Sequence, residues 1–155
     1  MLIIIVTFMY LYKVKTNYMA NQLHHILLVD DNRTTISLNK LLIEKVDSSV
    51  ELTIAHDGKA ALDILHGIVQ NNTKFPDLIL VDLKMPVMDG IEFYQNFKQF
   101  FSPEQAVATK VVMLTTSMAS QDFKQAAEEG IVYYLNKPLT TTKLKKLLLN
   151  EPAVL

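Results

Sequence analysis

Residues 76–90 read PDLILVDLKMPVMDG, and this stretch decides the fold. It contains the run LILV at 78–81, which is continuously apolar and too short for an independent helix. Such a run predicts a strand that is buried on both faces, as is typical of parallel sheets. Asp82 ends this strand, and Asp89-Gly90 opens the amphipathic segment that follows. The stretch therefore predicts one strand-to-helix unit of an α/β fold.

The same alternation continues along the chain on both sides of this unit. Short apolar runs predict strands at residues 25–29, 50–55, 78–81, 110–114 and 131–135. Amphipathic segments predict helices at residues 34–46, 59–70, 91–101, 121–129 and 140–149. The helical period is matched in the first helix by Ile36, Leu38, Leu41, Leu42 and Val46, and in the second by the inward-facing Ala61, Leu62, Leu65 and Val69. Five strands alternating with five helices predict a parallel sheet covered on both faces, with right-handed crossovers.

Length and composition narrow the class of protein. The chain has 155 residues, half of them apolar, which fits a single domain with its own core. The sequence contains no cysteine, so disulfides and thiolate metal sites are excluded, and we expect a reducing, cytoplasmic location. A formal net charge of −1 gives no overall positive field, which argues against direct nucleic-acid binding.

Residues 1–22 form an N-terminal extension ahead of the expected domain at 23–150, and residues 151–155 form a short tail. The apolar run at 2–12 is shorter than the roughly 20 residues of a membrane span, and it lacks the flanks of a secretory signal. Three interpretations remain: an extra strand or apolar tail, a weak membrane-surface anchor, or a start assigned too far upstream. Met19 directly precedes the first domain-like segment, which favours the third.

Charged and hydroxyl side chains follow four of the five expected strands. In an open α/β sheet, ligands bind outside the carboxyl ends of the strands, so we expect these side chains to converge. They are Asp30 and Asp31 after the first strand, Asp82 after the third, Thr115, Thr116 and Ser117 after the fourth, and Asn136, Lys137 and Pro138 after the fifth.

This set has the chemistry of phosphoryl transfer to a carboxylate. Three crowded carboxylates repel one another, and a hard cation such as Mg²⁺ relieves that repulsion. A carboxylate can also act as a nucleophile toward phosphorus, while the protein positions groups and neutralises charge on the phosphoryl oxygens. Lys137 offers a cation for that purpose and Thr115 a hydroxyl donor.

Each group also has an ordinary structural interpretation. The acidic pair with Asn32 is a plausible turn and helix cap, and Asp82 a solvated residue at a strand end. The hydroxyl run is plausible as capping material for the fourth helix, and Lys137-Pro138 as a turn. Because four such groups fall on the ends of strands in one sheet, a shared site is favoured over four coincidences.

Five motifs resemble the receiver domain of bacterial two-component response regulators. They are LVDDN at 28–32, AHDGKAAL at 55–62, PDLILVDLKMPVMDG at 76–90, MLT at 113–115 and LNKPL at 135–139. The resemblance covers residues 24–149, with the motifs in family order and spacing. It implies a flavodoxin-like (βα)5 three-layer sandwich with strand order 2-1-3-4-5, here as a stand-alone, single-domain type.

The resemblance also implies a role for individual residues. Asp82 would be the phosphoacceptor, with Thr115 and Lys137 binding the phosphoryl group. Mg²⁺ would be held by Asp30, Asp31, Asp82 and the backbone carbonyl of Lys84. Thr115 and Tyr134 would form the switch, the ring of Tyr134 moving inward on phosphorylation, and Lys84 and Ser117 would tune the hydrolysis rate.

The implied partners are proteins. The donor would be a phosphohistidine on a sensor histidine kinase or histidine phosphotransfer protein, and the chain would catalyse only its own phosphorylation and dephosphorylation. A downstream protein would bind the face formed by the fourth helix, fifth strand and fifth helix, which includes Phe123, Lys124, Ala127, Tyr133 and Lys143. No membrane span is expected.

Two alternatives are weaker. A scaffold that never switches does not need the complete set of acidic pair, Thr115 and Lys137. A phosphatase acting through an aspartyl phosphate needs a second carboxylate two residues after the nucleophile, where this chain has Lys84.

Overall fold

The computed structural model describes residues 23–116, 121–131 and 133–148, and these form a five-stranded parallel sheet in the order β2-β1-β3-β4-β5. The strands are β1 (His25–Val29), β2 (Glu51–Ala55), β3 (Leu78–Asp82), β4 (Lys110–Thr115) and β5 (Tyr134–Asn136). The helices are α2 (Arg33–Val46), α3 (Gly58–Gln70), α4 (Gly90–Phe100), α5 (Pro103–Ala108), α6 (Gln121–Glu128) and α7 (Thr141–Leu148). The predicted flavodoxin-like fold and strand order are confirmed.

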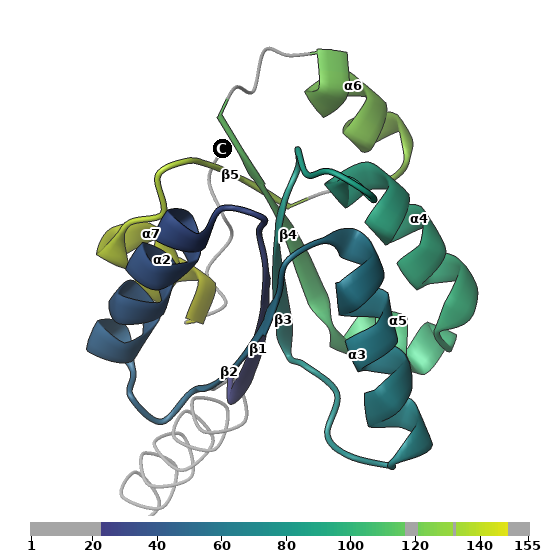
Figure 1. Cartoon of the computed structure of the whole chain (residues 1–155), viewed down its shortest axis with the longest axis horizontal. Coiled ribbons are helices and arrows are strands. Elements are labelled where there is room, and N and C mark those ends of the chain that lie inside the picture. The colour runs from purple at the N-terminus through teal and green to yellow at the C-terminus, as the bar shows by residue number, and fades with distance from the viewer. Residues whose placement is uncertain (1–22, 117–120, 132, 149–155) are drawn as a thin grey trace, which may run out of the picture.

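The sheet separates two apolar clusters. Helices α2 and α7 lie together on one face, and α3 and α4 cover the other (Figure 1). Successive residues of a strand point to opposite faces, so Leu27 and Val29 join the cluster under α3 and α4, whereas Ile26 and Leu28 join the cluster under α2 and α7. This explains why residues 26–29 of β1 and 78–81 of β3 are apolar without interruption.

All five strands present their carboxyl ends at the same edge of the sheet. Val29 at the end of β1 is paired with Ala55 of β2 and Val81 of β3, and Asp82 is paired with Leu114 of β4. The chain leaves β1 toward β2 on one side and later returns to β3 on the other. The strand order therefore reverses next to the residues that follow Val29, where α/β sheets bind their ligands.

Three residues expected at helical spacing or facing inward lie at the surface instead. Leu38 and Leu41 of α2 are each 63% exposed, and Val69 of α3 is 44% exposed. In α2 the face toward the sheet is occupied by Ile36, Ile43 and the polar Asn39. A helix buries one stripe, and at about 100° per residue Leu38 and Leu41 lie on the side of α2 away from that stripe.

The structure differs from the sequence prediction in three elements. Helix α5 was not expected; Ser102 caps it in a capping box with Gln105, and a proline stands in its first turn. Strand β2 is an edge strand, so Glu51 is exposed and the strand is not buried on both faces. Strand β5 begins at Tyr134 rather than at residue 131. Within the described ranges, no helix is long and apolar enough to cross a membrane.

A carboxylate at the opposite edge of the sheet joins the starts of β1 and β3. Asp77 accepts hydrogen bonds from the backbone N–H groups of His24 and His25 at 2.8 and 2.9 Å, and from Lys74 at 3.1 Å. Burial acts to raise the pKa of Asp77, but these donors outweigh it and leave the pKa lowered. The charged form of Asp77 is therefore more favourable in the folded chain than in the unfolded chain.

We expect Asp77→Ala to lower the free energy of unfolding at pH 7 by about 1–3 kcal/mol, because two backbone donors lose their acceptor. A carboxylate with a lowered pKa stabilises above its unfolded pKa and loses that contribution as the pH falls through its folded pKa. The difference in free energy of unfolding between wild type and variant should therefore become smaller below about pH 4. Urea unfolding from pH 7 to pH 2.5 measures it; a gap that is constant with pH would contradict the assignment, and Asp63→Ala is the exposed control.

Candidate functional site

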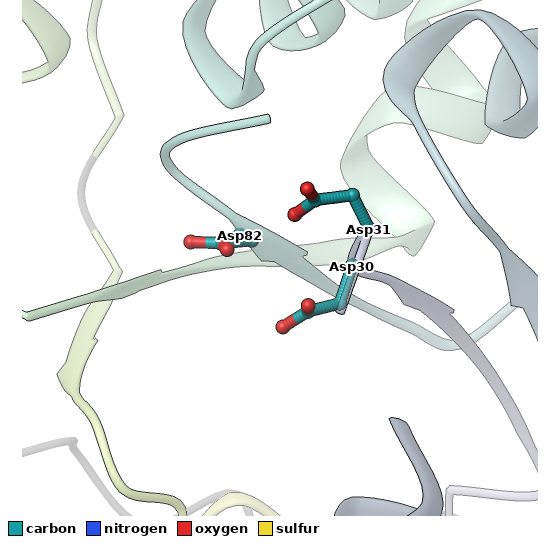
Figure 2. Close-up of side chains that lie close together, drawn as sticks. All are labelled: Asp30, Asp31 and Asp82. Atoms are coloured by element: carbon teal, nitrogen blue, oxygen red, sulfur yellow. The ribbon is translucent and has the colours of Figure 1, made fainter. Parts of the chain in front are cut away.

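Three carboxylates meet at the carboxyl edge of the sheet. Asp30 and Asp31 directly follow β1, and Asp82 is the last residue of β3, so the three side chains come from adjacent strands (Figure 2). Each offers one oxygen, and these oxygens all lie within 4.8 Å of one another. The side chains differ in solvent exposure: Asp30 is completely buried, whereas Asp31 is exposed. We call these three residues the acidic cluster.

The start of α2 sets the orientation of the acidic pair. Asn32 caps the helix by accepting a hydrogen bond from the Thr35 N–H at 3.0 Å. The N–H of Asn32 in turn donates to Oδ1 of Asp30 at 2.9 Å. The ordinary capping interpretation is thus correct for Asn32, but it uses only Oδ1 of Asp30 and neither oxygen of Asp31. The cap and the site coexist.

Lys137 is the cation of the site. Its Nζ lies 2.9 Å from Oδ2 of Asp30 and 2.8 Å from Oδ2 of Asp82, so it bridges two members of the acidic cluster. The backbone N–H of Lys137 donates to the carbonyl of Thr115 at 2.6 Å, which ties the residue to the end of β4. The lysine side chain is 19% exposed. One buried carboxylate pair therefore shares one largely buried ammonium group.

Burial and charge shift the pKa values in this site. Burial raises the pKa of Asp82, and the neighbouring Asp30 adds to the rise; the ammonium group of Lys137 and the N–H of Lys84 oppose it without cancelling it. Burial acts to lower the pKa of Lys137, but Asp82 and Asp30 outweigh it, so this pKa is raised. Lys137 therefore carries its charge at neutral pH, and Asp82 is a carboxylate whose ionised form is less favoured than in water.

The loop between β3 and α4 is held close against Asp82. The N–H of Lys84 donates to Oδ1 of Asp82 at 3.3 Å. A Cβ atom at Gly90 would lie 2.6 Å from the backbone oxygen of Asp82, so the loop can return this closely only at a glycine. The other side of the loop is fixed by Gly58, whose N–H donates to the Met88 carbonyl at 3.2 Å. The two glycines thus position this loop, a role that their places in the sequence motifs did not indicate.

The two expected switch residues are both buried. Thr115 is 4% exposed at the end of β4, and Tyr134 is 5% exposed in β5. The Tyr134 hydroxyl donates to the carbonyl of Ile131 at 2.6 Å, and its ring lies edge to face against Phe123 of α6, with 4.5 Å between ring centres. The structure thus shows the inward orientation of the ring. Ser117 lies outside the described residues.

The donor set of the acidic cluster fits Mg²⁺. Its oxygens are hard ligands, one of them belongs to an exposed side chain, and Mg²⁺ binds proteins through one or two carboxylates while keeping several waters. The negative charge exceeds the single positive charge of Lys137. Asp30, Asp31 and Asp82 are therefore the side chains that would hold the ion, and the carbonyl of Lys84 remains a predicted fourth ligand.

We expect Mg²⁺ to raise the melting temperature of the chain, because an ion that binds only the folded state stabilises it by about 2.7 kcal/mol at one hundred times its dissociation constant. Asp31→Asn should remove most of this shift, since Asp31 is the exposed member of the acidic cluster and makes no hydrogen bond with its side chain among the described residues. Thermal unfolding with Mg²⁺ and with a chelator measures the effect. Asp63→Asn should keep the full shift, and an unchanged shift in Asp31→Asn would exclude it as a ligand.

Comparison with known proteins identifies the family. The family model described as "Response regulator receiver domain" matches residues 26–149. The chain therefore belongs to the response regulator receiver domain family of two-component signalling. Two of the motifs that carried the resemblance, at 28–32 and 76–90, contain the three carboxylates of the acidic cluster.

Individual relatives agree with this assignment. The chain is 35% identical over 121 residues to the probable methanogenesis regulatory protein FilR2 of Methanothrix harundinacea, which covers 78% of this chain and 76% of FilR2. It is 35% identical over 122 residues to the transcriptional regulatory protein CpxR of Escherichia coli, covering 79% of this chain but only 46% of CpxR. The solved structure of the phosphorylated cyanobacterial phytochrome response regulator RcpA matches with a TM-score of 0.65 and 27% identity, covering 82% of this chain and 89% of that one.

Proposed function

We propose that this chain is a phosphorylation-dependent signalling switch that accepts a phosphoryl group on Asp82 from a phosphohistidine of a sensor histidine kinase or histidine phosphotransfer protein. The observation that carries the proposal is the bridge of Lys137 to Asp30 and Asp82 beside the exposed Asp31. This arrangement places a fixed cation next to a single nucleophile and leaves the solvent side of the acidic cluster for a metal ion.

The transfer step needs little covalent chemistry from the protein. A carboxylate oxygen of Asp82 forms a bond to phosphorus while the bond from phosphorus to the imidazole nitrogen of the donor breaks. The nitrogen keeps the electron pair of that bond. Mg²⁺, when bound by the acidic cluster, supplies positive charge to the phosphoryl oxygens. Lys137 supplies a second charge at a fixed position, and such preorganised charge is the main source of catalysis in phosphoryl transfer.

Hydrolysis removes the phosphoryl group: the oxygen of a water molecule forms a bond to phosphorus while the bond from phosphorus to the Asp82 oxygen breaks, the Asp82 carboxylate keeps that electron pair, and the proton of the water passes to solvent. Lys84 stands two residues after Asp82, with an exposed side chain at the mouth of the site. We assign to Lys84 and Ser117 the tuning of this hydrolysis. Because no carboxylate occupies the position of Lys84, the chain lacks the acid/base group through which a phosphatase would turn over an outside substrate. The receiver thus acts on its own phosphoryl group.

Signal output would pass through the switch residues to the face formed by α6, β5 and α7. The phosphoryl group adds strong acceptors that attract the hydroxyl of Thr115. Tyr134 would respond to that movement, because it pairs with Met113 of the strand that carries Thr115, and its hydroxyl and ring contact Ile131 and Phe123. A change there alters the surface that carries Tyr133, which is 38% exposed. A partner protein that binds this surface would sense the phosphorylation state.

An apolar pair on α2 supports a protein donor. Leu38 and Leu41 are exposed and lie three residues apart, and they therefore form one stripe on the helix surface. Helix α2 begins directly after Asn32, beside the acidic cluster. A helical donor that packs on this stripe would bring its phosphohistidine to the edge of the sheet that contains Asp82.

The direct test is to incubate the chain with acetyl phosphate and Mg²⁺ and to follow its intact mass. We expect one added phosphoryl group, lost in mild alkali as an acyl phosphate is. Reductive trapping followed by peptide sequencing should place it on Asp82. A chelator should prevent the reaction. Labelling of another residue, or no labelling with Mg²⁺ present, would refute the proposed function.

A further inference from the structure

Lys143 of α7 reaches back to the loop that carries Lys137. Its Nζ donates to the backbone carbonyl of Asn136 and, at 2.9 Å, to the backbone carbonyl of Pro138. These two carbonyls flank Lys137 on either side. From the sequence, Lys143 is expected only on the face that would bind a downstream protein, and there is no reason to connect Lys143 with the acidic cluster.

The position of Lys143 on its helix is unfavourable for a cation. It is the third residue of α7, and its N–H donates to Oγ1 of Thr140, so it lies in the first turn, where the helix dipole is positive. The other lysines of the helix, Lys145 and Lys146, lie in the last turn, where positive charge is favourable, and both are exposed. Positive charge is unfavourable in the first turn of a helix, so helix stability does not explain a lysine at this position. Its hydrogen bonds to the loop carbonyls do explain it.

The loop is connected on the other side to the sheet. The peptide group between Asn136 and Lys137 donates its N–H to the carbonyl of Thr115 at 2.6 Å, and its carbonyl accepts from Lys143. Both polar groups of this peptide are thus fixed, one by β4 and one by α7. The side chain of Lys137 starts from this fixed peptide and ends between Asp30 and Asp82.

We propose that Lys143 is a positioning residue for Lys137: by binding the carbonyls on both sides of it, Lys143 holds the ammonium group of Lys137 between Asp30 and Asp82. The functional consequence for phosphoryl transfer rests on the proposed function, but the effect on the acidic cluster does not. Lys137 and a metal ion compete for the same carboxylates. Any loosening of Lys137 therefore favours metal binding while it removes a fixed charge from the transfer step.

The first measurement is Mg²⁺ affinity by calorimetry, which needs no phosphorylation. We expect Lys143→Met to tighten Mg²⁺ binding by roughly threefold, because Lys137 competes less well. General damage to the site would weaken Mg²⁺ binding, so the sign separates positioning from a merely structural role. Lys146→Met, on the same helix, should bind Mg²⁺ as wild type does, and Lys143→Arg should remain close to wild type because it can donate to both carbonyls.

The second measurement is a double-mutant cycle with Lys137→Met. If Lys143 acts through Lys137, then Lys143→Met should change neither Mg²⁺ affinity nor the labelling rate once Lys137 is already replaced. In the otherwise native chain, Lys143→Met should slow labelling by acetyl phosphate roughly tenfold, as expected for a misplaced catalytic group. Unchanged or weaker Mg²⁺ binding in Lys143→Met, or equal effects with and without Lys137, would overturn the proposal. If the wild-type chain takes no label, the proposed function is refuted. The Mg²⁺ affinities would then decide the positioning role of Lys143 by themselves.

Discussion

Asp82→Asn should reduce phosphoryl incorporation from acetyl phosphate by at least about a thousandfold, to the limit of detection, because the amide cannot act as the nucleophile. Asparagine keeps the size of the side chain and its place at the end of β3. The rate is measured from intact mass against time in the presence of Mg²⁺. Asp63→Asn removes a carboxylate of an exposed ion pair with Lys59 and should be labelled as fast as wild type.

Stability distinguishes loss of the nucleophile from loss of the fold in Asp82→Asn. The pKa of Asp82 is raised by burial, so folding disfavours its ionised form, and the carboxylate costs stability as the pH rises through this pKa. Without Mg²⁺ at pH 7, the variant should therefore be at least as stable as wild type. Labelling of Asp82→Asn at the wild-type rate would show that the phosphoryl group goes elsewhere.

Lys137→Met should lower the rate of phosphoryl transfer and raise the affinity for Mg²⁺. We expect labelling by acetyl phosphate to slow roughly a hundredfold, which is the usual cost of removing one fixed charge donor from a transition state. We expect Mg²⁺ to bind roughly tenfold more tightly, because the competing ammonium group at 2.8–2.9 Å from Asp82 and Asp30 is gone. Calorimetry and mass spectrometry on the same preparation measure the two effects.

The matched control for Lys137→Met is Lys59→Met. Lys59 pairs with Asp63 at 2.9 Å, but both side chains are exposed, so the pair is worth little and lies outside the acidic cluster. Labelling and Mg²⁺ affinity should both stay at the wild-type values in this variant. Weaker Mg²⁺ binding in Lys137→Met would mean that the lysine supports the metal site rather than competing with it.

The fold was predictable from the sequence because burial on both faces gives a strong pattern. The runs at 26–29 and 78–81 are buried at every position, and they therefore specify a parallel sheet without any knowledge of contacts. The errors arose where the pattern is weaker. Leu38 and Leu41 fit an apolar helix period, but the polar Asn39 takes the inward position between them. Helix α5 had a readable signal in Ser102 and Gln105, a capping box in which Pro103 marks a start rather than an end.

The sequence predicted which residues form the candidate site, but not the contacts that they make there. Position at the strand ends was enough to bring together Asp30, Asp31 and Asp82, and the structure gathers them as expected. The bridging of two carboxylates by Lys137 was not predictable, since it depends on the turn after β5, where the N–H of Lys137 donates to the carbonyl of Thr115. The close return of Gly90 against Asp82 was also hidden, because a glycine before a helix has several common causes. The functional roles assigned to these residues stay predictions.

The division of the core by the sheet has a consequence for how such a chain can diverge. Helix α2, with the Leu38–Leu41 stripe, packs into one apolar cluster, whereas Phe123 and Tyr134 belong to the other. Substitutions that refit one cluster leave the packing of the other intact, because the two share only the strands between them. The part of the target face that contains Phe123 and Tyr134 can therefore change independently of the stripe on α2, whereas the part on α7 packs in the same cluster as α2 and cannot. The acidic cluster at the shared edge is the component that both must leave unchanged.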